Sequence, residues 1–220
     1  MNTSERVQTL VFEKYEGLRN DFVVLDERNG TAAPSLPVQA RVALCDRHAG
    51  VGADGVLTLL SPRVPDAIVR MHVTNADGSV PEMCGNGLRC VSRWLLDHDL
   101  IALDDPHFVD TDAGPLRCVV EESGVRVQMR GATTTGVCSD GPLVDEQIEV
   151  EGETFTATAL SVGNPHFVLE GPAHRGLALR AGPVLEHHAR FPARTNVEFV
   201  SVRSPTELDL FVWERGAGLT

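Results

Sequence analysis

The sequence predicts an α/β fold made of two similar halves, each built mainly from short strands. Apolar or alternating runs, bounded by turn pairs such as Gly-Pro and Ser-Gly, recur along most of the chain, while three segments have helical spacing. The chain also contains an internal repeat, because residues 20–26 (NDFVVLD) resemble residues 164–170 (NPHFVLE). Each copy places an asparagine before an apolar strand that ends in an acid. We therefore expect two halves that face each other, with one asparagine from each half near the seam.

Composition and charge narrow the class of protein. The 220 residues are 42% hydrophobic and 23% charged, an ordinary globular balance that can bury a core. A net charge of −12 argues against nucleic acid or an anionic membrane as a partner. No apolar run reaches the roughly 18 residues of a membrane span, and residues 1–11 lack the pattern of a secretory signal. We therefore expect a cytoplasmic protein without a membrane segment.

The cysteines indicate free thiols rather than disulfides or a metal site. The chain has five of them, an odd and scattered set with no CxxC pair and no Cys/His cluster. Such a set is typical of a reducing compartment. They are Cys45, Cys84, Cys90, Cys118 and Cys138.

The first half is predicted to consist of strands around two helices. Residues 12–26 are expected to start with a short strand and a turn. Further strands are expected at residues 22–25, 56–60, 67–73, 108–112, 116–121 and 125–129. Residues 38–45 have helical character, and a second helix follows Gly87, with its apolar face formed by Leu88, Val91, Trp94 and Leu95. Residues 49–55 contain a literal GxGxxG. A dinucleotide fingerprint needs a strand before it and a helix after it, and here the order is reversed, so a glycine-rich bend is expected instead.

The second half is also predicted to consist mainly of strands, over a shorter length of chain. We place the boundary between the halves at residues 130 and 131, beside a Thr- and Gly-rich passage, residues 132–140, that has no period. A helical region is expected at residues 173–188, with Gly182-Pro183 inside it. Strands are expected at residues 148–150, 155–162, 167–169, 196–202 and 207–213.

Cys84 is the first candidate catalytic residue. Gly85 and Gly87 flank it with residues that cannot shield it, and the predicted helix begins just beyond. At a helix start, the free N–H groups and the positive end of the dipole favour an anion. We therefore expect the pKa of the Cys84 thiol to be lowered towards a thiolate, which would act as a base or a nucleophile near neutral pH. The same N–H groups could bind a substrate carboxylate.

Several turns carry asparagine, and one carries an adjacent acid and arginine. A single asparagine in a turn is usually there for turn geometry. Together with an exposed thiol, the set would suit an amino acid, which needs acceptors for its ammonium and donors for its carboxylate. Lys14 is the only lysine, and it is not placed to form a pyridoxal Schiff base. The set comprises Asn20, Asn75, Asn86, Asn164, Asn196, Glu214 and Arg215.

The motifs around these residues resemble those of the diaminopimelate epimerases, a family of cofactor-independent amino-acid epimerases of lysine and peptidoglycan synthesis. They occur in family order across essentially the whole chain. CGNG alone also marks proline racemases, whereas NADGS together with GNPH and ERGAG is much more specific. The matching segments are GLRNDF (17–22), RHAGVGAD (47–54), NADGS (75–79), CGNG (84–87), GNPH (163–166), RFP (190–192) with Asn196, and ERGAG (214–218).

The resemblance implies a fold and a mechanism. The fold would be two pseudo-symmetric α/β halves, each a curled, mostly antiparallel sheet around a central helix, with the active site in the cleft between them. In the mechanism, a thiolate removes the α-proton on one face and a thiol on the other face returns one; Cys84 is one of these groups, and a homodimer is implied. Catalytic roles fall to Cys84, His166 and Glu214, with His166 orienting the reacting centre. Substrate contacts fall to Asn20, Asn75, Gly85, Asn86, Asn164, Asn196, Glu214 and Arg215.

Two features depart from the family pattern. Arg19 stands beside Asn20 where the family usually has glycine. The family's second catalytic cysteine, in an Ala-Cys-Gly turn that starts the second central helix, has no counterpart up to Thr220, so we expect the second half to lack that helix. The expected function is epimerisation of LL-diaminopimelate to the meso form. The alternatives are a truncated, non-catalytic paralogue that binds an amino acid or a partner protein, and a proline racemase-like isomerase.

Overall fold

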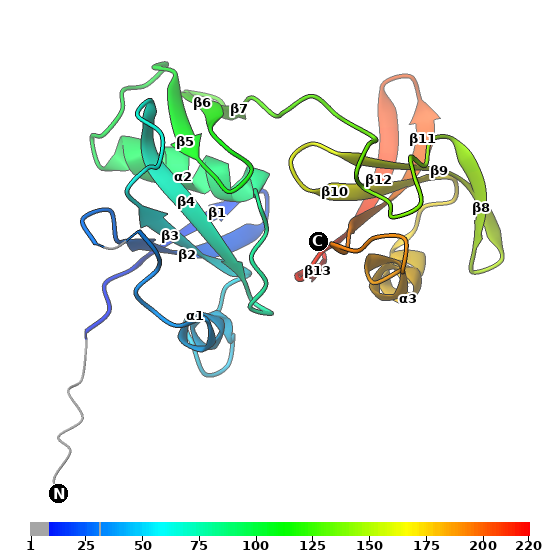
Figure 1. Cartoon of the computed structure of the whole chain (residues 1–220), viewed down its shortest axis with the longest axis horizontal. Helices are drawn as coiled ribbons and strands as arrows, with labels where there is room; N and C mark the ends of the chain where they lie inside the picture. Colours follow the sequence, from blue (N-terminus) through cyan, green and yellow to red (C-terminus); the bar gives the residue numbers. More distant parts are fainter. Residues whose placement is uncertain (1–8, 31) are drawn as a thin grey trace, which may run out of the picture.

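The structure is a computed structural model, which describes residues 9–30 and 32–220. Figure 1 shows two lobes side by side, joined by the segment between β7 and β8. Each lobe contains one sheet, and we call them the first half (β1–β7, α1 and α2) and the second half (β8–β13 and α3). No helix among the described residues is long and apolar enough to span a membrane.

The first half is a seven-stranded sheet whose strands pair in the order in which they occur in the chain. The β2–β3 and β4–β5 pairs are parallel and the other four pairs are antiparallel. The strands are β1 (Glu13–Gly17), β2 (Asn20–Asp26), β3 (Gly55–Leu60), β4 (Ala67–Asn75), β5 (His107–Asp110), β6 (Leu116–Glu121) and β7 (Gly124–Val127).

Helix α2 (Gly85–Asp97) packs into the curl of this sheet and forms the core of the first half. Its predicted apolar face is buried, and the Trp94 side chain is only 1% exposed. Val91 and Leu95 lie on the same face because they are spaced by about one helical turn. The other face of the sheet is covered by α1 (Val38–Cys45), which contacts β3 and β4. Apolar side chains therefore alternate along β2 between two cores, Phe22 towards α2 and Val23 towards α1.

The glycine-rich bend after α1 is a packing device. A Cβ at Gly50 would lie 2.1 Å from the Ala43 carbonyl oxygen, and one at Gly55 would lie 2.9 Å from the Thr74 carbonyl oxygen. Gly52 has φ +79°, a conformation that L-residues rarely adopt. The three glycines thus allow the chain to turn closely from α1 into β3, as predicted, in the reverse order of a dinucleotide-binding unit.

The second half is a six-stranded sheet in the order β13-β12-β11-β10-β9-β8, and only its β10–β11 pair is parallel. Helix α3 (Arg175–Glu186) packs against β11, β12 and β13. The strands are β8 (Glu146–Val150), β9 (Glu153–Ser161), β10 (Pro165–Glu170), β11 (Asn196–Ser204), β12 (Glu207–Glu214) and β13 (Gly218–Leu219).

The two halves share one connectivity, which explains the repeat in the sequence. β2 pairs antiparallel with β1 and parallel with β3, and α1 connects β2 to β3. In the same way, β10 pairs antiparallel with β9 and parallel with β11, and α3 connects them. The two predicted copies lie at β2 and β10. Helix α2 of the first half has no equivalent on the second sheet within residues 9–30 and 32–220. The predicted fold of two mostly antiparallel sheets is therefore confirmed.

Candidate active site

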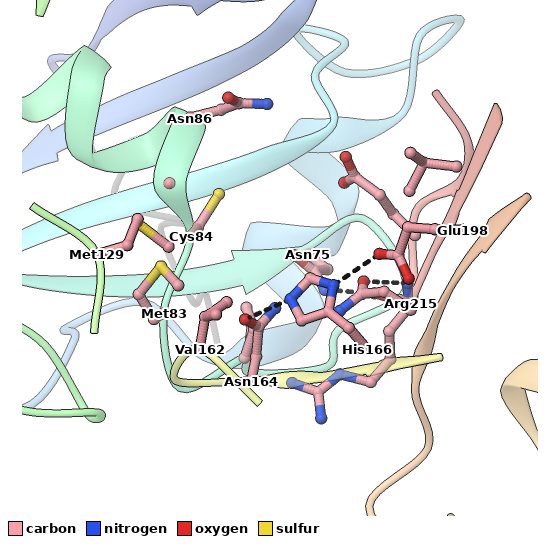
Figure 2. A pocket seen from close by; sticks show the side chains of 15 residues that line it. Asn75, Met83, Cys84, Asn86, Met129, Val162, Asn164, His166, Glu198 and Arg215 are labelled. Carbon is pink, nitrogen blue, oxygen red and sulfur yellow. Dashed lines mark hydrogen bonds and ion pairs between the residues drawn. The ribbon is translucent and has the colours of Figure 1, made fainter. Parts of the chain in front are cut away.

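A cavity of about 200 Å³ lies between the two halves, and we call it the inter-half cavity. Its first-half wall comes from the loop after β4 and the start of α2, and its second-half wall comes from β10, β11 and the end of β12 (Figure 2). The lining residues are Asn75, Pro81, Met83, Cys84, Gly85, Asn86, Met129, Val162, Asn164, His166, Asn196, Glu198, Val212, Glu214 and Arg215.

Nine of the ten predicted site residues line this cavity, and Asn20 is the exception. Asn20 is 5% exposed and lies behind the cavity wall, where its side-chain oxygen accepts a hydrogen bond from the amide of Asn86. Its own amide donates to Asp54 at 3.3 Å, and Asp54 also accepts from Arg47 at 2.7 Å. Asn20 therefore supports Asn86 rather than facing the cavity. The neighbouring Arg19 has φ +70°, in the left-handed region.

Cys84 is the N-cap of α2. Its backbone is extended (φ −139°, ψ 112°), and Sγ accepts a hydrogen bond from the backbone N–H of Gly87 at 3.3 Å. The predicted position at a helix start is thus observed, with the helix beginning at Gly85 instead of after Gly87.

The predicted lowering of the Cys84 pKa is wrong for the structure. Burial raises the pKa of the Cys84 thiol to about 11. The backbone N–H groups of Gly87 and Asn86 act in the opposite direction, and the carboxylate of Glu214 adds to the rise. Desolvation outweighs the helix start, because a thiolate loses more by leaving water than two N–H groups return. The thiol is therefore protonated near neutral pH.

Arg215 connects the two walls. One arm of its guanidinium donates to the Ala193 carbonyl at 2.9 Å, and the other donates to Glu82 of the first half at 2.6 Å. Its backbone N–H donates to Asn196 Oδ1 at 2.9 Å, and its carbonyl accepts from Asn75 Nδ2 at 3.2 Å. Two of the predicted asparagines therefore hold the backbone of Arg215 in place, one from each half.

The turn that carries Arg215 is docked closely on the first half. Gly216 has φ +79°, and a Cβ there would lie 2.5 Å from Ser79 Oγ and 2.8 Å from Asp77 Oδ2. Only glycine allows the ERGAG turn to approach the NADGS loop this closely. The buried carboxylate of Glu186, at the end of α3, also holds this turn, because it accepts a hydrogen bond from the Gly216 N–H at 3.2 Å.

Glu214 and His166 are the titratable groups that sequence analysis placed on the second-half wall. Burial raises the pKa of Glu214, the charges of Asp54 and Glu198 add to this rise, and Thr220 opposes it through a hydrogen bond of 3.2 Å. His166 lies between two partners: Nδ1 is 2.6 Å from Glu198 Oε1, and Nε2 is 3.0 Å from Asn164 Oδ1 (Figure 2).

Sequence reasoning missed Glu82 and Glu198. Glu198 follows Asn196 by two residues on β11, so the alternation of a strand turns both towards the same side, and this spacing could have identified it. Glu82 lies two residues before Cys84 in a loop without periodicity, and nothing in the sequence marks its partner, Arg215, which is 133 residues away. No group of three or more His, Cys, Asp or Glu side chains in the described part of the chain could hold a metal ion.

Comparison with known proteins decides the family. The family model described as Diaminopimelate epimerase matches residues 12–135. A diaminopimelate epimerase from a Synechococcus strain is 43% identical over 223 residues, which cover 96% of this chain and 78% of that protein. The chain belongs to the diaminopimelate epimerase family.

Other members of the diaminopimelate epimerase family align over similar lengths. Diaminopimelate epimerase 1 from a Nostoc strain is 40% identical over 95% of this chain and 78% of its own length. The protein from Desulfitobacterium hafniense is 42% identical over 94% of this chain and 76% of its own length. This chain is thus related to amino-acid epimerases over nearly its whole length, and it spans a little over three quarters of theirs.

Solved structures show the same fold at low sequence identity. A probable proline racemase from Agrobacterium radiobacter has a TM-score of 0.69 at 15% identity, covering 96% of this chain and 72% of that one. A hydroxyproline epimerase from Agrobacterium vitis has a TM-score of 0.67 at 14% identity, covering 94% of this chain and 71% of that one. The two-sheet architecture is therefore shared with racemases and epimerases of other amino acids.

Proposed function

We propose that this chain epimerises LL-diaminopimelate to meso-diaminopimelate by proton transfer at the α-carbon, without a cofactor. The observation that carries the proposal is the position of Cys84. Its thiol stands at a helix start on one wall of the inter-half cavity, opposite a wall that holds asparagines, Glu214 and Arg215. This arrangement offers a proton-transfer group on one side and amino-acid recognition on the other.

Each end of the substrate has a proposed place. The carboxylate of the reacting head would lie at the start of α2, where the N–H groups of Gly85 and Asn86 and the helix dipole favour an anion. The second amino-acid head would meet Asn75, Asn164, Asn196, Glu214 and Arg215. Arg215 suits a substrate that carries a second carboxylate, which would take the place of Glu82 as the acceptor of the guanidinium.

The protonated thiol of Cys84 suits the step that returns a proton to the α-carbon. Inversion needs a second group on the opposite face. Cys84 is the one cysteine among the described residues that line the inter-half cavity, and His166 and Glu214 are titratable groups on the other wall. Removal of the α-proton on the Cys84 face requires the small fraction of protein in which this thiol is ionised, and inversion also requires a group on the other wall.

The test follows LL-diaminopimelate in deuterated water, with α-proton exchange measured by NMR and inversion by chiral chromatography. Cys84→Ser should lower the exchange rate by about 100- to 10,000-fold, the range of one acid–base group, because an alcohol is a far weaker acid than a thiol. Cys138→Ser is the matched control, since Cys138 is buried in the second core away from the cavity. It should exchange at the wild-type rate.

Other outcomes would redirect the assignment. Near-normal exchange by Cys84→Ser would show that Cys84 is not the proton-transfer group. Binding of diaminopimelate without exchange would indicate a non-catalytic paralogue. Faster exchange of proline or hydroxyproline, tested in parallel, would indicate a racemase-like isomerase.

We further propose that the protein is a homodimer, that it works in the cytoplasm and that it serves lysine synthesis. We propose that the boundary between its two halves lies between residues 130 and 131.

A further inference from the structure

Glu198 carries a mostly buried carboxylate that sequence motifs did not assign to the site. It lies on β11, and its cross-strand neighbour on β10 is Val168. His166 is two residues before Val168 on the same strand. The side chains of His166 and Glu198 therefore both lie on the cavity side of the sheet. Glu198 Oε1 is 2.6 Å from His166 Nδ1, and the two side chains are only 12% and 23% exposed.

The carboxylate has little else to compensate its burial. Glu198 Oε2 is buried and has no hydrogen-bond partner within the described residues. Burying a carboxylate is costly unless it accepts hydrogen bonds. The hydrogen bond to His166 is therefore the main contact that stabilises the Glu198 carboxylate. Its short distance is typical of a charge-assisted hydrogen bond.

The geometry settles which ring nitrogen carries a proton. An ionised carboxylate can only accept, so Nδ1 of His166 is the donor. Nε2 points the other way, 3.0 Å from the side chain of Asn164, which lines the inter-half cavity. The contact with Asn164 is complementary when Nε2 is also protonated or when the amide presents its NH₂ group. In both cases the proton on Nδ1 stays with Glu198.

We propose that Glu198 is a positioning residue that holds the proton on Nδ1 of His166 and thereby directs Nε2 towards Asn164 and the substrate cavity. Its effect on the reaction rests on the proposed function, whereas its effect on the imidazole does not. A carboxylate that orients a histidine from behind fixes both the ring and its tautomer. Figure 2 shows the arrangement, with His166 between Glu198 and Asn164, and Cys84 on the opposite wall.

The imidazole itself supplies the first test. In protein labelled with ¹⁵N-histidine, long-range ¹H–¹⁵N spectra report which ring nitrogen is protonated, and His166→Gln identifies the signal among the eight histidines. Wild type should show a protonated Nδ1 across the pH range in which the fold is stable. Glu198→Ala should lose the proton on Nδ1 of His166 and show the Nε2–H tautomer, which a free histidine prefers when it is neutral. Glu198→Gln should retain Nδ1–H in part, because its amide oxygen still accepts.

Glu170→Ala is the matched control, because it removes the same side chain from an exposed end of β10. It should leave the His166 spectrum unchanged. An unprotonated Nδ1 in wild type would overturn the proposal, and that spectrum needs no variant to fold. An unchanged His166 signal in Glu198→Ala would overturn it too.

The second readout is α-proton exchange of diaminopimelate. Glu198→Ala should lower the exchange rate roughly tenfold or more, as for carboxylates that orient ligating histidines, while the binding constant changes little. Exchange in Glu198→Ala at the wild-type rate would overturn the positioning role. If wild type shows no exchange but the spectra behave as expected, the proposed function fails and the assignment of Glu198 to His166 stands.

Discussion

At Cys84 two opposing effects act on one sulfur atom. The N–H groups at the start of α2 favour the thiolate, and burial in the inter-half cavity favours the thiol. Burial prevails here, and a wetter cavity would move the balance towards the thiolate. The position of Cys84 follows from its neighbours in the chain, whereas its protonation state depends on a wall supplied by residues more than 75 positions later. Local sequence could therefore predict the first and not the second.

Alkylation tests the protonation state of Cys84 directly. Only the thiolate reacts with iodoacetamide, and a raised pKa means that the thiol keeps its proton as the pH rises through the ordinary range. The rate at Cys84 should increase about tenfold per pH unit above pH 7 and level off only near the pKa of about 11. The rate is followed by mass spectrometry of the Cys84 peptide. A plateau near pH 8 would contradict the burial argument and restore the lowered pKa.

At the scale of the elements, α3 packs tightly because of one glycine. A Cβ at Gly182 would lie 2.5 Å from Cγ of Trp213 on β12, so the helix rests directly on the indole. The indole N–H donates to Glu186 at the end of the same helix, at 2.8 Å. Pro183 follows Gly182 inside α3, and the helix continues through it although proline has no backbone N–H to donate. The helical region expected at residues 173–188 is thus one helix, with Gly182 and Pro183 inside it as predicted.

Two substitutions in α3 should have opposite effects on stability. Gly182→Ala forces a methyl group into Trp213 and should lower the free energy of unfolding by about 1–3 kcal/mol. Gly176→Ala is the matched control in the same helix, where the nearest atoms are side-chain ends of Arg180 and His174 at 3.4 Å. There the higher helix propensity of alanine should add about 0.5–1 kcal/mol. Urea unfolding measures both, and a stabilising Gly182→Ala would show that α3 can move away from β12.

The elements show which features the sequence could predict. Val38–Cys45 and Leu116–Glu121 have the predicted bounds, because periodicity and turn residues are local signals. β13 was missed because two residues, Gly218 and Leu219, have no detectable period. The site is partly predictable for the same reason. Turn chemistry marks the asparagines, but the pairing of His166 with Glu198 depends on the parallel register of β10 and β11, which no local pattern specifies.

At the scale of the whole molecule, the halves differ in how well their sheets are covered. The first sheet has α1 on one face and α2 on the other. On the second sheet, the large side chains of Val202, Leu208 and Leu210 are about half exposed on β11 and β12. Among the described residues, the polar contacts between the halves are the ion pairs Arg215–Glu82 and Arg194–Asp77 and the hydrogen bond from Asn75 to the Arg215 carbonyl. We therefore expect the second half to be the less stable one and the halves to be weakly coupled.

Each half carries one tryptophan, so fluorescence can follow the halves separately. Trp94→Phe leaves Trp213 as the reporter of the second half, and Trp213→Phe leaves Trp94 as the reporter of the first. The two substitutions are matched, because each removes an indole N–H that donates to a glutamate at 2.8 Å. In urea, the Trp213 signal should change at a lower concentration than the Trp94 signal. Coincident transitions would contradict weak coupling and would indicate one cooperative unit.

Diaminopimelate should change this behaviour, because the inter-half cavity takes residues from both halves. A ligand at about 100 times its Kd adds about 2.7 kcal/mol to the stability of the state that binds it. Since either half alone presents only one wall, both must be folded to bind. The ligand should therefore raise the Trp213 transition most and bring the two transitions together. A shift confined to one tryptophan would mean that the substrate is held by one half alone.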